Sequence, residues 1–141
     1  MKSILVAAAV MALASPVFAE GDPAAGEVQF NRQCVACHVV QNDAGETLAG
    51  RTARTGPNLF GISGRSLGAV EGYRYGDAIV ALGETGVVWN EDVFVSYAQN
   101  PTAYLRQALQ DNRARGKMAY QVRDAQQAAD IWAFLATVGI E

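Results

Sequence analysis

The sequence predicts an all-α domain in which helices and long loops surround one covalently bound group. Capped segments with apolar residues at helical spacing occur between residue 22 and residue 138. Residues 39–72 show no sustained period and contain seven glycines, so they are expected to be mostly loop. A loop of this length is unusual in a compact domain unless it wraps something that completes the core. The third observation is a short cysteine and histidine motif just before that loop.

This motif consists of two cysteines three positions apart and a histidine directly after them, Cys34-Val35-Ala36-Cys37-His38. It is the signature of c-type haem attachment. One helical turn brings both thiols to the edge of one porphyrin, where each adds to a vinyl group as a thioether. The histidine then lies under the iron and offers an imidazole nitrogen. Cys34 and Cys37 are therefore predicted to hold one haem c, and His38 to be the proximal iron ligand.

Other interpretations of the cysteine pair remain open at this point. A thioredoxin-like redox pair, and with it a thiol oxidoreductase without haem, is expected in a βαβ context, and no strand pattern precedes Cys34. A zinc site needs four ligands, whereas the chain has two cysteines and one histidine, so a carboxylate would have to complete it. A disulfide with a two-residue spacer would be a poor structural staple.

The length of 141 residues suits one domain preceded by an export signal. Lys2, the apolar run at 4–14 and the small residues before position 20 predict a cleaved signal peptide over 1–19, with an uncleaved membrane anchor as the alternative. The domain is then expected over 20–141, in the periplasm. All 14 acidic residues and all basic residues except Lys2 lie in it, which gives a formal charge of −4. This charge argues against nucleic-acid binding.

The first helix is predicted to begin with Asp22 as N-cap and Pro23 as first helical residue, and to run to about Cys34. Gly26 and Phe30 are four apart and share one face, where the glycine permits another helix to cross closely. In the loop that follows, four apolar residues are expected to face the haem: Leu59, Phe60, Ile62 and Leu67.

Two short helices are predicted after this loop. Asp77 is expected to cap a helix over 78–82 that Gly83 ends. Asn90 is expected to cap the next helix, with two acidic residues in its first turn that suit the helix dipole. This helix is predicted to end near Asn100.

The remaining part of the chain predicts two more helices. Pro101 is expected to begin a helix that extends to Leu109. After a polar loop, Asp124 and Gln127 form a capping-box pattern, and the last helix is predicted to run to about Val138 with an apolar stripe on one side.

The second axial ligand of the iron is inferred by elimination. After removal of the signal peptide, the chain retains one histidine, His38, and one methionine, Met118. Met118 lies in a polar loop, which is a poor place for a core-filling methionine. Lys117, Tyr120 and a bound water remain alternatives. A thioether opposite an imidazole favours ferrous iron and raises the reduction potential.

With these residues in place, the sequence resembles the class I c-type cytochromes, specifically the large bacterial cytochrome c2 type, over 20–141. The resemblance is carried by six stretches: CVACH at 34–38, RTARTGPNLFGISGR at 51–65, the lone Trp89, NPTAYL at 100–105, GKMAY at 116–120 and DIWAFL at 130–135. An insertion before Met118 is typical of that subgroup. The resemblance implies that Gly26 and Phe30 form the face that crosses the last helix near Phe134.

The resemblance also implies roles for residues that spacing does not identify. The carbonyl of Pro57 would accept a hydrogen bond from His38 and so orient the ring. Tyr97 matches a position beside the methionine sulfur. A buried carboxylate needs hydrogen-bond donors and preferably a cation. Three residues match positions that hydrogen-bond the buried haem propionate: Arg65, Tyr75 and Trp89.

The function implied by the resemblance is that of a soluble periplasmic one-electron carrier, not an enzyme. It would take electrons from a cytochrome bc1 complex and deliver them to a photosynthetic reaction centre, a cytochrome oxidase or both. A peroxidase-like or gas-binding haem protein is the alternative. The carrier is expected to be a monomer that touches membrane complexes only peripherally.

Docking in this family usually uses lysines around the haem edge, but Lys117 is the single lysine after residue 19. Arginines are expected to replace the others, and Arg74 is expected to lie off the docking face. The predicted docking residues are Arg32, Arg54, Arg113, Arg115, Lys117 and Arg123.

Overall fold

A computed structural model of the chain describes residues 20–139. The predicted signal peptide lies outside the described residues. Over residues 20–139 no helix is both long enough and apolar enough to span a membrane. The elements within this range are α1 (Pro23–Gln33), β1 (Val40–Gln41), β2 (Thr47–Ala49), α2 (Asp77–Glu84), α3 (Glu91–Gln99), α4 (Pro101–Leu109) and α5 (Ala125–Val138).

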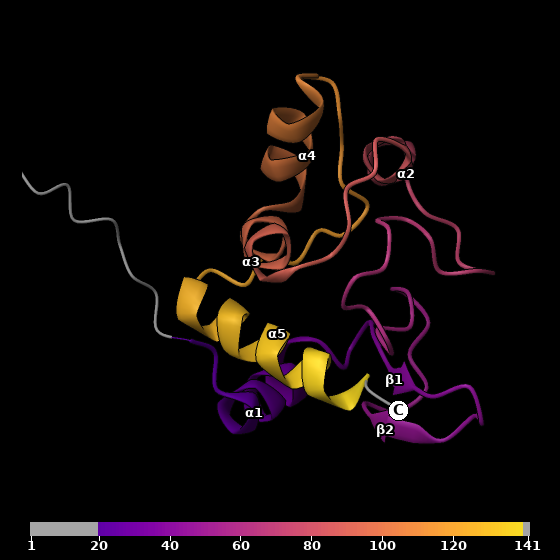
Figure 1. The fold of residues 1–141 in the computed structure, drawn as a ribbon, viewed down its shortest axis with the longest axis vertical. Helices are drawn as coiled ribbons and strands as arrows, with labels where there is room; N and C mark the ends of the chain where they lie inside the picture. Colours follow the sequence, from indigo (N-terminus) through magenta and orange to yellow (C-terminus); the bar gives the residue numbers. More distant parts are fainter. Residues whose placement is uncertain (1–19, 140–141) are drawn as a thin grey trace, which may run out of the picture.

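The first and last helices, α1 and α5, cross and pack closely against each other (Figure 1). As predicted, the Asp22 side chain caps α1. Gly26 lies at the crossing, because a Cβ atom there would be 1.9 Å from the carbonyl oxygen of Asp130. The rings of Phe30 and Phe134 pack beside this contact with centroids 5.6 Å apart. The predicted crossing face is confirmed, and a glycine is required there for close approach.

Helices α3 and α4 lie on the other side of α5 (Figure 1). The predicted N-cap of α3, Asn90, is confirmed, and α4 begins at Pro101 as predicted, with Asn100 as an N-cap that was not predicted. The Asn90 side chain accepts a hydrogen bond from the third residue of α3 at 2.9 Å, and Asn100 does the same for α4 at 3.0 Å. Phe94 of α3 packs against Trp132 of α5 with ring centroids 5.5 Å apart. Apolar contact therefore joins α3 to the crossing pair.

The predicted capping box of α5 forms on one side only. The Asp124 carboxylate accepts a hydrogen bond from the Gln127 N–H at 2.9 Å, as expected of an N-cap. The Gln127 side chain instead accepts a hydrogen bond from Gln33 of α1 at 2.8 Å. The side chain that could have closed the box contributes to the contact between α1 and α5.

The prediction for α2 is wrong at both ends. The helix includes Asp77 as its first residue, has Gly76 as its N-cap, and continues through Gly83 to Glu84. A Cβ atom at Gly83 would lie 2.0 Å from the carbonyl oxygen of Leu67. The glycine therefore permits close contact between α2 and the preceding loop, and it does not end the helix.

The loop prediction for residues 39–72 overlooked a small antiparallel hairpin, in which β1 pairs with β2. Its turn is closed by hydrogen bonds at 3.0 Å between Asn42 and Glu46 and between Gly45 and Asn42. Gly45 has φ +81°, a conformation that favours glycine. With strands of two and three residues, the hairpin leaves the domain predominantly helical.

Candidate haem-binding site

A mainly apolar cavity of about 460 Å³ lies between the end of α1, the loop before α2, helix α3 and the segment before α5. This volume is in the usual range for cofactor sites. The cavity brings together residues that are up to 99 positions apart in the sequence, from Arg32 to Ile131. Every predicted haem-binding residue lines it, namely Cys34, Cys37, His38, Pro57, Arg65, Tyr75, Trp89, Tyr97 and Met118.

The two cysteines lie on a helical turn that continues α1. The N–H groups of Cys37 and His38 both donate to the carbonyl oxygen of Cys34, at 3.1 and 2.9 Å. Both thiols are free and line the cavity. Burial, together with the neighbouring Cys37, raises the pKa of Cys34 to about 12. The pair thus presents two unpaired sulfurs to one cavity, as covalent haem attachment requires.

The imidazole of His38 is buried and held in one orientation. Its Nδ1 lies 2.8 Å from the carbonyl oxygen of Pro57. Because a carbonyl only accepts, Nδ1 carries the proton and Nε2 keeps its lone pair for a metal. Burial lowers the pKa of His38 below its usual value, so the ring is neutral at neutral pH. Gly56 packs against the ring, since a Cβ atom there would lie 2.3 Å from Cε1.

Polar groups gather at one part of this apolar cavity. The guanidinium of Arg65 donates a hydrogen bond to the Phe60 carbonyl, and the hydroxyl of Tyr75 accepts one from the N–H of Val70 at 3.2 Å. The ring of Trp89 is buried and also lines the cavity. A cation with two nearby donor side chains suits a ligand that has an apolar body and carboxylate groups. Porphyrin with two propionates has this character, so the residues present fit a haem.

The segment that carries Met118 completes the lining. The Met118 side chain is half-buried. Both alternative ligands have their polar ends engaged elsewhere, because the Lys117 ammonium donates to the carbonyl of Arg74 and the Tyr120 hydroxyl donates to Gln33 at 3.1 Å. Met118 is thus favoured as the second axial donor, and its ligation stays a prediction.

Tyr97 is buried at the cavity wall and packs edge-to-face on Trp89, with ring centroids 5.2 Å apart. Burial raises the pKa of Tyr97 to about 12, so its hydroxyl stays protonated. Of the four loop residues expected to face the haem, Leu59 and Ile62 line the cavity, but Phe60 and Leu67 do not. Leu67 is instead buried where the loop meets α2.

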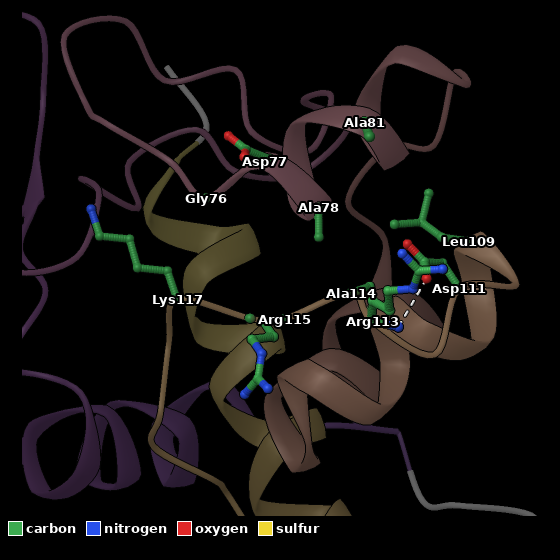
Figure 2. A pocket seen from close by; sticks show the side chains of 11 residues that line it. Gly76, Asp77, Ala78, Ala81, Leu109, Asp111, Arg113, Ala114, Arg115 and Lys117 are labelled. Atoms are coloured by element: carbon green, nitrogen blue, oxygen red, sulfur yellow. Dashed lines mark hydrogen bonds between the residues drawn. The ribbon is translucent and has the colours of Figure 1, made fainter.

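A second cavity, of about 520 Å³, adjoins the first between α2, the end of α4 and the loop before Met118. Alanines of α2 and Leu109 face it, and Figure 2 shows the Arg115 and Lys117 side chains extending away from α2. Of the predicted docking residues, Arg113, Arg115 and Lys117 line this second cavity. Arg32 and Lys117 line the first. Arg54 and Arg123 line neither and are exposed.

Arg74, which was expected to lie off the docking face, is a neighbour of Lys117, one of the predicted docking residues. Its carbonyl oxygen accepts the hydrogen bond from Lys117, so the two residues are neighbours across 43 positions of sequence. Arg74 therefore cannot serve as a distant control for docking.

Several residues of the site were not predicted. Gly56 contacts His38 directly, and the sequence signal for it is the Gly56-Pro57 dipeptide, which is typical of a turn. Tyr73 lines the cavity and donates from its hydroxyl to the Thr55 carbonyl at 2.8 Å. The zinc alternative finds no support in residues 20–139, where no group of three or more His, Cys, Asp or Glu side chains gathers.

Comparison with known proteins gives close relatives along nearly the whole chain, although no family model matches it. Cytochrome c2 of Rhodovulum adriaticum is 53% identical over 120 residues, which cover 85% of this chain and 94% of that protein. Cytochrome c-551 of Roseobacter denitrificans is 47% identical over 97% of this chain and 95% of its own length. The crystal structure of cytochrome c2 from Rhodobacter sphaeroides superposes with a TM-score of 0.84 at 42% identity, over 86% of this chain and 99% of that one.

Proposed function

Since the chain belongs to the cytochrome c2 family of class I c-type cytochromes, we propose that it is a soluble periplasmic carrier that moves single electrons from a cytochrome bc1 complex to a photosynthetic reaction centre, a terminal oxidase or both. Members of this family are electron-transfer proteins and not enzymes, and they carry one covalent haem c. In this chain Cys34 and Cys37 attach it.

The observation that carries the proposal is that two side chains able to bind iron, His38 and Met118, line the same cavity. His38 is neutral and its Nδ1 is engaged with Pro57, so its Nε2 is available to a metal. Met118 supplies a thioether from the other wall segment. Bound haem supplies an iron that alternates between the ferric and ferrous states. With both donors bound, the iron would have no position left for a substrate, and this arrangement would suit a carrier better than a peroxidase-like or gas-binding protein.

The remaining cavity residues are proposed to hold the haem and adjust its potential. Arg65, Tyr75 and Trp89 would hydrogen-bond a propionate that is kept from water, and the Arg65 guanidinium would offset its negative charge. Tyr97 would present its protonated hydroxyl beside Met118, since burial keeps its pKa near 12. Because these groups are fixed by the fold, they need little rearrangement when the charge on the iron changes.

The test uses Met118→Ala, with Ile62→Ala as a matched control that removes another cavity-lining apolar side chain but no sulfur. Met118→Ala is expected to lower the reduction potential and to let the ferrous protein bind carbon monoxide. The wild type and Ile62→Ala are expected to bind it poorly at neutral pH. Tight binding by the wild type would favour the gas-binding alternative, and an unchanged potential in Met118→Ala would exclude this residue as ligand.

The choice of partners is tested by kinetics. Reduction by isolated cytochrome bc1 complex is compared with oxidation by reaction centres and by terminal oxidase, at equal ionic strength. Fast reaction with bc1 and with at least one acceptor is expected. Failure to react with bc1 would contradict the proposed direction of electron flow.

A further inference from the structure

The segment that carries Met118 is tethered to the rest of the domain on both sides of the methionine. Residues 117–121 form neither helix nor strand, so no ladder of backbone hydrogen bonds fixes them. Instead, side-chain contacts hold the segment in place, one made by Lys117 directly before Met118 and one made by Tyr120 two positions after it. Their anchor points lie in different parts of the chain.

The first tether connects the segment to the loop before α2. The Lys117 ammonium donates to the carbonyl of Arg74 and lies 4.6 Å from the centroid of the Tyr73 ring, which is a cation–π contact. Tyr73 in turn donates from its hydroxyl to the carbonyl of Thr55 at 2.8 Å. Thr55 precedes Gly56, which packs against the proximal histidine. This chain of contacts therefore links the Met118 segment to the loop that holds His38.

The second tether connects the segment to the crossing of α1 and α5. The Tyr120 hydroxyl donates to Oε1 of Gln33 at 3.1 Å. Nε2 of Gln33 donates to the side-chain oxygens of Gln29 and Gln127, at 2.8 Å each. Because both donor hydrogens of the amide are used, its oxygen is left to face Tyr120. Gln33 directly precedes Cys34, so this anchor is fixed beside the haem attachment site.

From these contacts we propose that Lys117 and Tyr120 are positioning residues that clamp the Met118 segment over the cavity and so limit how often Met118 leaves the iron. The proposal rests on the proposed function, in which Met118 is the axial ligand. It gives Lys117 a role different from docking, because its ammonium is bound to its own chain. Arg115, two positions earlier, is exposed at the edge of the second cavity.

The clamp is tested in the haem-loaded protein with Lys117→Leu and Tyr120→Phe. Arg115→Leu is the control for loss of a cation, and Tyr104→Phe is the control for loss of a hydroxyl outside the cavity lining. The first measurement is the rate at which imidazole binds the ferric protein, since imidazole must wait for Met118 to leave. Lys117→Leu is expected to raise this rate about fivefold or more, and Tyr120→Phe about two- to fivefold. The two effects should multiply in the double variant, because the anchors are separate.

Two further readouts separate local positioning from general loss of stability. The absorption band of sulfur-ligated ferric iron should weaken or broaden in Lys117→Leu and Tyr120→Phe but not in the controls. Amide hydrogen exchange should quicken over 116–122 and stay unchanged in α1 and α5. Unchanged imidazole rates in both clamp variants, or exchange that quickens equally in α1 and α5, would overturn the proposal.

The same experiment includes Met118→Ala, which tests the proposed function separately. If Met118 is the ligand, this variant binds imidazole much faster than the wild type. If it binds at the wild-type rate, the ligand assignment fails, and with it the clamp's effect on iron access. If Met118→Ala is fast while Lys117→Leu and Tyr120→Phe match the wild type, the ligand assignment stands and only the clamp fails.

Discussion

The α1–α5 crossing and the walls of the haem cavity are stabilised in different ways. At the crossing, side chains and backbone touch directly, and the largest buried side chains include Phe30, Ile131 and Leu135. In the cavity, the loop before α2 and the Met118 segment face each other across about 460 Å³. The crossing is complete with its own residues, whereas the cavity walls need a bound group to complete the core.

The size of the cavity indicates how much the second region depends on that group. Without a bound group, the mainly apolar lining of this partly open cavity would face water, and each Leu- or Ile-sized side chain left unburied forgoes about 1.5–3 kcal/mol. The whole stability of a domain is typically about 5–15 kcal/mol. Without bound haem, the domain is therefore not expected to fold.

The largest expected effect follows from preventing covalent attachment. In a Cys34→Ser/Cys37→Ser variant prepared without haem, far-ultraviolet circular dichroism should show loss of most helix, including α1 and α5, because the crossing alone cannot offset an apolar cavity lining that faces water. The wild type should keep its colour through acid solvent extraction, since thioethers survive where coordinate bonds do not. Native helix content in the haem-free variant would show that the crossing is self-sufficient. Extractable haem in the wild type would contradict attachment through these cysteines.

The crossing is tested directly by Gly26→Ala. A Cβ atom there would lie 1.9 Å from the Asp130 carbonyl oxygen, so α1 and α5 must move apart. The free energy of unfolding, measured by denaturant titration of the haem-loaded protein, should fall by about 3 kcal/mol. Val28→Ala on the exposed side of the same helix should change it by less than about 0.5 kcal/mol. Equal effects of the two substitutions would refute close packing at the crossing.

A smaller effect is expected from Arg65→Ala at the cavity wall. This variant removes the Arg65 hydrogen bond to Phe60 and the cation proposed to face a propionate, so the free energy of unfolding should fall by about 2 kcal/mol. The less compensated negative charge should favour ferric iron and lower the reduction potential. Arg65→Lys keeps the charge, so its reduction potential should fall less than that of Arg65→Ala. A higher potential in Arg65→Ala would contradict the propionate role.

How far the sequence predicts each region depends on the range of the signals. The N-caps Asp22, Asn90 and Asp124 were predicted because an N-cap acts within three residues, and the start of α4 was predicted from Pro101. The predicted end of α2 was wrong because Gly83 is required for a close contact with Leu67, sixteen positions away, and does not end the helix. No local pattern signals such a contact.

The candidate site divides in the same way. The attachment motif is contiguous, and the two axial candidates follow from a composition with one histidine and, after residue 19, one methionine. The tether from Tyr120 to Gln33 joins residues 87 positions apart. Gln33 and Tyr120 are common residue types with no distinguishing neighbours, so their hydrogen bond can be identified only from the structure.

The smallest expected effect concerns the exposed basic residues that line the two cavities, such as Arg115, and leaves stability unchanged. Exposed charges steer a partner and raise the association rate more than the final affinity. Arg115→Glu should therefore slow oxidation by the membrane partner about two- to fivefold at low salt. The difference should shrink as ionic strength approaches physiological values, where screening acts within about 8 Å. Arg51→Glu makes the same charge change at an exposed position just after β2, away from both cavities, and should slow the reaction less. Equal rates for the two variants at every salt concentration would mean that the basic residues lining the cavities do not guide docking and that the contact between this protein and its partner is mainly apolar.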